Sequence, residues 1–140
     1  MDSYTICNEL GRLEDVIGHF LEDDGITEML ISLEFVFEHG RVFQEAIPEF
    51  DEISIKALPP DEDCVPVHLG NLEPWSLVLG RGALWVWDLR NHQGYADGLQ
   101  YSFANTVSDG EIIVQLMVIG SQISVYSVAE SHNKWLQPTP

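Results

Sequence analysis

Residues 83–104 read ALWVWDLRNHQGYADGLQYSFA, and their pattern indicates a β-rich fold. Two strand-like runs, 83–90 and 99–103, flank the polar and glycine-rich segment 91–98. A segment of this kind between two apolar runs is typical of a β-hairpin with a long loop. We therefore expect an antiparallel hairpin in the second half of the chain.

The surrounding sequence extends the β pattern in both directions. Alternation of apolar and polar residues predicts further strands, which we place at 26–38, 42–47, 53–57, 111–119 and 122–129. The strand at 111–119 is apolar on both faces, so we expect it in the middle of a sheet or against a second layer. Pro74 and Gly80 predict a short helix between them.

Residues 8–22 allow two interpretations. Five apolar residues have the spacing of one helical stripe, namely Leu10, Leu13, Ile17, Phe20 and Leu21. Gly11 and Gly18 each disfavour a helix interior by about 1 kcal/mol, and a strand over 13–20 is the alternative. The class predicted in either case is α+β with β dominant, with about seven mostly antiparallel strands and one or two helices. We expect a single domain over residues 1–130 and a flexible tail over 131–140.

The charge of the chain is strongly negative and unevenly distributed. The 140 residues carry a formal net charge of −17. Residues 1–63 contain seventeen Asp and Glu against three Lys and Arg, whereas residues 64–140 contain six against three. Such a field repels phosphates, so we expect no binding to nucleic acid or to anionic membranes. It would attract a basic protein partner, although acidity also simply keeps a protein soluble.

The sequence favours a cytoplasmic location. No apolar run reaches the about 18 residues of a membrane-spanning helix, and the first residues, MDSYT, lack the features of a signal peptide. Cys7 and Cys64 are far apart and belong to no CxxC motif. In a reducing compartment we expect both to be free, packed thiols.

The segment 91–98 is the candidate binding site. The candidate binding residues are its polar side chains and the aromatic and acidic residues of the preceding strand: Asn91, Gln93, Tyr95, Asp97, Trp85, Trp87 and Asp88. The alternative is that the segment only builds a turn, because glycine supplies positive φ and Asn or Asp can bond to the nearby backbone. Its length exceeds that of a two-residue hairpin loop, which favours a binding role.

The tryptophans also allow two interpretations, as part of the core or as part of a binding surface. Trp85 and Trp87 have the same parity and should share one face of their strand. Regular hairpin pairing would add Tyr101 and Phe103 to that face. An aromatic cluster on one sheet face belongs to the core more often than to a ligand platform.

The sequence contains few features of an enzyme active site. The five histidines are dispersed without metal-ligand spacing, and no nucleophile or phosphate-loop motif is present. Asp88 and Asp97 are the one pair of carboxylates that we expect to meet, across the hairpin loop. We therefore predict no catalytic residue, no metal and no cofactor, and we favour a protein that is not an enzyme.

Three motifs carry a resemblance to a known family: Pro74-Trp75-Ser76, Trp85-Val86-Trp87 and the Asn-x-Gln-Gly-Tyr-x-Asp-Gly turn at 91–98. They resemble a family of small uncharacterised bacterial proteins, a domain of unknown function, over roughly residues 26–128. The resemblance implies a compact α+β domain and assigns no residue a role. The chain is also similar in character to small acidic immunity proteins that neutralise bacterial toxins.

We derive three hypotheses of function from these features. The first is a non-enzymatic interaction protein whose acidic N-terminal half docks a basic partner. The second is a small-ligand binder or a hydrolase that uses the 91–98 loop with Trp85, Trp87 and Tyr95 as walls. The third is a homodimer whose interface is the aromatic hairpin.

Overall fold

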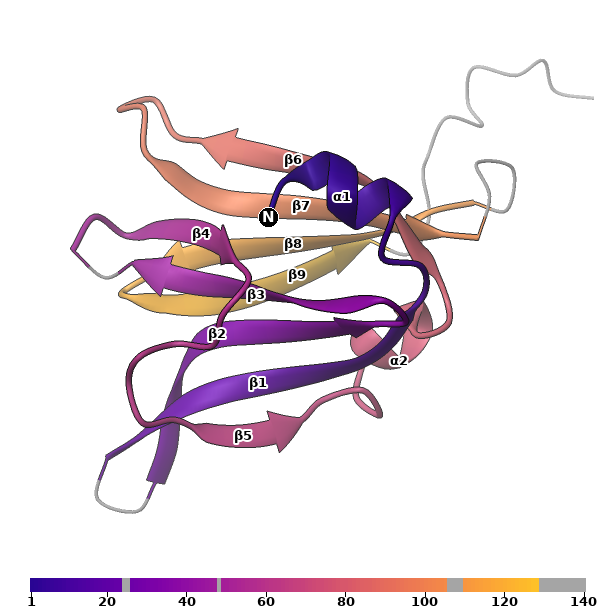
Figure 1. Ribbon diagram of the computed structural model, residues 1–140. Helices are drawn as coiled ribbons and strands as arrows, with labels where there is room; N and C mark the ends of the chain where they lie inside the picture. The colour runs from indigo at the N-terminus through magenta and orange to yellow at the C-terminus, as the bar shows by residue number, and fades with distance from the viewer. Residues whose placement is uncertain (24–25, 48, 106–109, 129–140) are drawn as a thin grey trace, which may run out of the picture.

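The computed structural model describes residues 1–23, 26–47, 49–105 and 110–128, and these form two antiparallel sheets packed face to face (Figure 1). The first sheet contains five strands in the order β4-β3-β2-β1-β5. Its strands are β1 (Leu13–Asp23), β2 (Ile26–Phe37), β3 (Gly40–Ile47), β4 (Glu52–Lys56) and β5 (Val65–His68). The second sheet contains four strands in the order β6-β7-β8-β9. Its strands are β6 (Gly82–Arg90), β7 (Ala96–Ala104), β8 (Ile112–Ile119) and β9 (Gln122–Val128).

Two short helices accompany the sheets in the described part of the chain. Helix α1 (Ser3–Asn8) packs against β6, and the Asp2 side chain caps it by accepting a hydrogen bond of 2.9 Å from the Thr5 backbone N–H. Helix α2 (Trp75–Val78) follows Pro74 and buries Trp75 and Val78. Neither helix approaches the length or the apolar character that crossing a membrane requires.

Residues 13–22 of the segment 8–22 lie in strand β1, and the helical interpretation of this segment is wrong. Strand β1 begins at Leu13 and pairs with β2 along nearly its whole length, from Leu13 opposite Phe37 to Asp23 opposite Ile26. The helical spacing of the apolar residues here is compatible with a strand because the β1–β2 register shifts at three places. Backbone pairing with β2 therefore outweighs a weak helical pattern that already contains two glycines.

The predicted class is confirmed as mostly antiparallel β with two short helices, but the number of strands is nine rather than about seven. The two additional strands are β1 and β5. Strand β5 contains Pro66, which lacks a backbone N–H, and accordingly it lies at the edge of the first sheet. The expectation that 111–119 lies inside a sheet is confirmed, because β8 pairs with both β7 and β9.

Both sheets contribute to one hydrophobic core. At its centre the Phe35 ring of β2 makes edge-to-face contacts with Tyr101 and Phe103 of β7 and with Trp75 of α2, at centroid distances of 5.0, 5.9 and 5.5 Å. A buried hydrogen bond of 2.9 Å, donated by Gln44 Nε2 to Tyr101 Oη, also joins the two sheets. The predicted tail at 131–140 lies outside the described residues.

Candidate functional site

The hairpin loop is shorter than the sequence predicts, because β7 begins at Ala96 and only residues 91–95 are outside the strands. Asn91 organises this turn. Its Oδ1 accepts hydrogen bonds from the backbone N–H groups of Gln93 (2.9 Å) and Tyr95 (3.3 Å), and its Nδ2 donates to Asp97 Oδ2 at 3.2 Å. Gly94 has a φ of +88°, a conformation that glycine adopts without strain.

These contacts give Asn91 and Asp97 a structural role in the turn. Arg90 reinforces it by donating from Nη1 to the Gly94 carbonyl at 3.0 Å. Gln93 and Tyr95, by contrast, are exposed, and their side chains are free to meet another molecule. The loop thus divides into residues that build it and residues that it presents.

The tryptophans lie outside the core. Trp85 is 54% exposed and Trp87 is 41% exposed. Tyr101 and Phe103 are fully buried on the opposite face of the sheet, so the prediction that they join the tryptophan face is wrong. The cause is a register shift between Ala83 and Trp85: Ala83 pairs with Phe103, but Trp85 pairs with Ser102.

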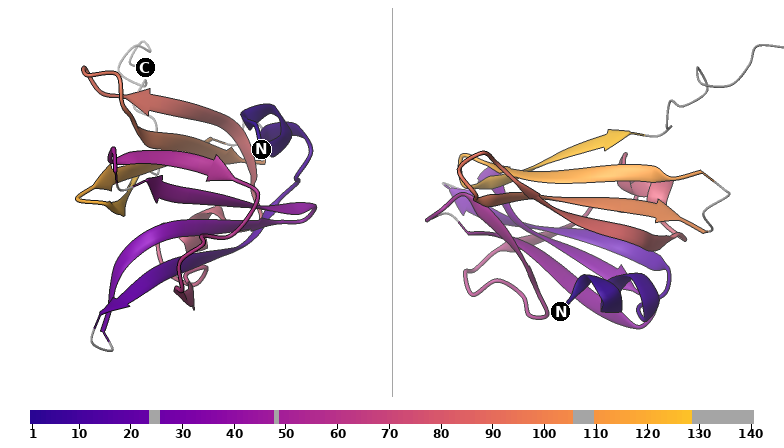
Figure 2. Two further views of the ribbon diagram at one scale, coloured as in Figure 1. Left: turned by 60° about the vertical axis from the view of Figure 1, so that its left-hand side comes forward. Right: turned by 90° about the horizontal axis from the view of Figure 1, so that it is seen from above.

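The register shift places Trp85 and Trp87 on the face of the second sheet that points away from the core, which we call the open face. Its central row runs across all four strands, since paired residues share a face, and consists of Trp87, Gln100, Gln115 and Tyr126. The adjacent row begins with Trp85 and ends with Val128 on β9. Tyr126 is 50% exposed and Val128 is 51% exposed. No other described helix or strand lies over this face (Figure 2).

A shallow hollow of about 480 Å³ lies at the end of the open face nearest the turn. Its apolar part is formed by Leu89, Met117, Ile119 and Tyr126, and its polar part by Arg90, Asn91, Asp97 and Gln115. Asp88 does not line it, because Asp88 pairs with Leu99, whose side chain is in the core, and therefore points to the other face. Asp97 lines the hollow and Asp88 does not, so the two carboxylates that we expected to meet do not come together in it.

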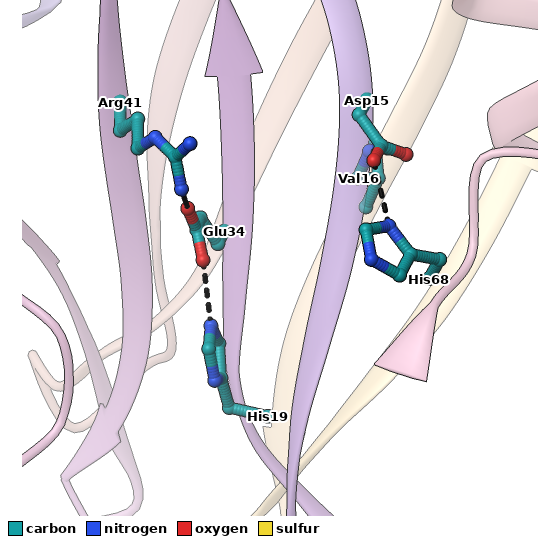
Figure 3. A network of polar contacts seen from close by, with 6 residues as sticks. All are labelled: Asp15, Val16, His19, Glu34, Arg41 and His68. Carbon is teal, nitrogen blue, oxygen red and sulfur yellow. Dashed lines mark hydrogen bonds and ion pairs between the residues drawn. The ribbon is translucent and has the colours of Figure 1, made fainter. Parts of the chain in front are cut away.

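The outer face of the first sheet carries a polar network that the sequence did not reveal (Figure 3). The buried Glu34 carboxylate lies between His19, whose Nε2 is 2.8 Å from Oε1, and Arg41, whose Nη1 donates to Oε2 at 2.5 Å. Nearby, His68 Nδ1 is 2.8 Å from Asp15 Oδ2. Two partners compensate the burial of the Glu34 charge, so this network has a structural explanation.

The outer face that carries this network is also crossed by a connection between two strands. The connection from β4 to β5 leads from one edge of the first sheet to the other, across the face that points away from the second sheet (Figures 1 and 2). The one signal in the sequence was Glu34 itself, a charge within the apolar run of β2. Its burial could not be inferred without knowing that β1 and β3 bring His19 and Arg41 to its carboxylate.

The same crossover forms an acidic hollow of about 240 Å³. Four carboxylate residues line it together with apolar side chains of β2, β3 and the crossover: Glu45, Glu49, Asp61 and Glu62, with Ile31, Ala46, Ile47 and Pro60. Glu45 Oε2 accepts from Lys56 Nζ at 2.6 Å, whereas its buried Oε1 has no hydrogen-bond partner among the described residues. We call this feature the acidic hollow.

Both cysteines are free thiols in the structure. Burial raises the pKa of the Cys7 thiol, and burial together with the nearby carboxylates of Glu62, Glu45 and Asp63 raises that of Cys64. A raised pKa leaves little thiolate near neutral pH, which is unfavourable for a nucleophile. The residues that the structure describes contain no group of three or more His, Cys, Asp or Glu placed to hold a metal ion.

The fold is thus a two-sheet antiparallel β structure with one sheet face that no other described helix or strand covers and an acidic hollow on the opposite side of the molecule. A family profile described as "Family of unknown function (DUF6334)" matches residues 4–132, and the chain belongs to this family. The prediction of a family without assigned function is therefore confirmed, and the match extends further at both ends than the resemblance over 26–128. No curated protein and no solved structure matches the chain.

Proposed function

We propose that this protein is a non-enzymatic interaction module of the bacterial cytoplasm that binds a basic protein, in the manner of an immunity protein. The acidic hollow is the observation that carries this proposal. It lies on the first sheet, whose five strands contain eight Asp and Glu against one Arg and one Lys. The four strands of the second sheet contain two Asp against one Arg.

The hollow has the chemistry that a lysine or arginine side chain requires. Such a side chain has an apolar stem and a cationic head. Ile47 and Pro60 provide apolar wall for the stem, and Glu49, Asp61 and Glu62 provide carboxylates for the head. The remaining negative field of the N-terminal half would steer a basic partner toward this side of the molecule.

The test is capture of a partner from lysate of the native host at low salt, followed by elution in a salt gradient. The variant Asp61→Asn/Glu62→Gln should release the partner at lower salt than the wild type. A matched control, Glu14→Gln/Glu22→Gln, changes the net charge equally at exposed positions outside the hollow and should have a smaller effect. An affinity that stays constant from low to high salt would contradict the proposal, because electrostatic docking weakens as ions screen it.

A second candidate function is binding of a small polar ligand in the hollow beside the hairpin turn. Its favourable observation is the convergence of Arg90, Asp97 and Gln115 on one apolar-floored depression. A ligand that occupies it should raise the melting temperature of the wild type and of a Tyr4→Ala control, since Tyr4 is exposed elsewhere. The Tyr126→Ala variant, which removes one wall, should lose that increase. An equal increase in both variants would exclude this hollow as the site.

A further inference from the structure

The open face contrasts with the rest of this acidic molecule because it carries almost no charge. Strands β8 and β9 contain no charged residue, and β7 contains only Asp97. Asp97 lies with the oppositely charged Arg90 at the corner beside the turn. At the other end the Glu111 carboxylate accepts a hydrogen bond from the Ser102 hydroxyl. Between these borders the exposed surface consists of uncharged side chains, mostly aromatic, aliphatic and amide.

This distribution suits a contact between two acidic molecules. In a two-sheet protein the open face is the surface farthest from the acidic first sheet. Packed sheets are about 10 Å apart, so two copies stacked through their open faces would hold their acidic sheets about 30 Å apart. That separation is about three to four times the Debye length of about 8 Å at physiological salt. Repulsion between the two copies would therefore be largely screened.

We propose that the open face binds the open face of a second copy of this chain, forming a symmetric dimer. The composition of the central row supports self-pairing, because the aromatic residues Trp87 and Tyr126 lie at its ends and the amides of Gln100 and Gln115 lie between them. An amide both donates and accepts hydrogen bonds, so each row can satisfy an identical row turned by a two-fold axis. Aromatic residues are enriched at such interfaces.

The size of the face fits a reversible dimer. Four strands spaced about 4.8 Å apart, each about eight residues long at about 3.4 Å per residue, cover about 500 Å² in projection. Standard interfaces bury about 800 Å² on each partner, and weak, transient ones bury less than about 600 Å². We therefore expect an equilibrium between monomer and dimer that depends on protein concentration.

Gln115 provides the test, because it lies near the centre of the face and any two-fold stacking brings the two copies of it close together. The wild-type chain should sediment increasingly as a dimer as its concentration rises from micromolar to millimolar. Gln115→Glu and Gln115→Lys should each weaken dimerisation about tenfold or more through like-charge repulsion. An equimolar mixture of the two variants should associate again, because opposite charges then face each other. Gln93→Glu, at an exposed position in the turn outside the central row, is the matched control and should dimerise as the wild type does.

Circular dichroism of each variant separates loss of the dimer from loss of the fold. A wild-type chain that remains monomeric at every concentration would overturn the proposal, as would a dimer that Gln115→Glu leaves intact. A mixture of the two variants that does not associate would also overturn it. The effect of salt on association distinguishes this dimer from the proposed complex with a basic partner. Added salt should preserve or strengthen the dimer, whereas it should weaken the complex at the acidic hollow.

Discussion

The hydrogen bond between Gln44 and Tyr101 offers a quantitative test of how the two sheets are joined. Both residues are fully buried, and Gln44 Nε2 donates to Tyr101 Oη at 2.9 Å. Gln44 Oε1 already has no hydrogen-bond partner in the described structure. Tyr101→Phe preserves the aromatic contacts of the ring but leaves the whole Gln44 amide buried without a partner. An unsatisfied buried polar group costs about 1–3 kcal/mol, and we expect the free energy of unfolding to fall by this amount.

A double-mutant cycle distinguishes this explanation from a loss of packing. Gln44→Met/Tyr101→Phe replaces both polar partners by apolar groups of similar shape, which can be nearly neutral or even stabilising. The double variant should therefore recover most of the stability lost in Tyr101→Phe. The assay is equilibrium unfolding in urea, monitored by tryptophan fluorescence, for the wild type, both single variants and the double variant. Unfolding of Tyr101→Phe at the wild-type urea concentration would refute the reasoning, as would additive losses in the double variant.

Three further predictions concern stability, pH and thiol reactivity. Burial raises the pKa of Tyr101 far above its ordinary value of 10.0, so the unfolded chain releases this proton at lower pH than the folded chain does. The free energy of unfolding should therefore fall as pH rises above about 10. Urea melts from pH 8 to pH 11 should show this fall, and it should be smaller in Tyr101→Phe, which lacks the hydroxyl group. The raised pKa values of Cys7 and Cys64 should make both thiols react with iodoacetamide more slowly than free cysteine at pH 8, and urea should abolish the difference. Gly18→Ala should lower the free energy of unfolding by about 1–3 kcal/mol in urea melts, because the added Cβ would lie 2.6 Å from a ring carbon of Phe20. Unchanged stability would show that the Phe20 side chain moves away without cost.

Much of the β architecture could be predicted from the sequence because its strands follow simple alternation. Strand β2 buries Leu33, Phe35 and Phe37 on one face, as the alternation of apolar residues along 26–38 predicts. The connection between the strands predicted at 26–38 and 42–47 is also short, since β2 ends at Phe37 and β3 begins at Gly40. The prediction is incomplete on the other face of β2. There Ser32 and Glu34 are buried as well, although alternation alone would place the polar residues of a strand on a face toward water.

The errors have a common physical origin, since each depends on which strands are neighbours rather than on local pattern. Strand β1 has a weak pattern of its own and is specified by pairing with β2 and β5. Glu34 is buried because His19 and Arg41 come from two other strands to meet its carboxylate. Long-range pairing of this kind leaves little trace in a single sequence.

The register shift between Ala83 and Trp85 shows how one residue determines the candidate interface. Side chains alternate along a strand, so a one-residue insertion in the pairing moves all later side chains to the opposite face. Ala83 is buried, whereas Trp85 and Trp87 are about half exposed, although all three have the same parity. Without the shift, Trp85 and Trp87 would point toward the core that holds Tyr101.

This arrangement has a cost for an isolated chain. A half-exposed tryptophan leaves about 100 Å² of largely apolar surface in water, which corresponds to about 2.5 kcal/mol at about 25 cal/mol per Å². For Trp85 and Trp87 together the forgone stabilisation is about 5 kcal/mol, and whole domains are stable by only about 5–15 kcal/mol. A second copy on the open face would recover part of this free energy. The bulge in β6 and the proposed dimer are therefore two parts of one explanation, and a monomeric wild-type chain would leave the exposure of both tryptophans without a physical reason.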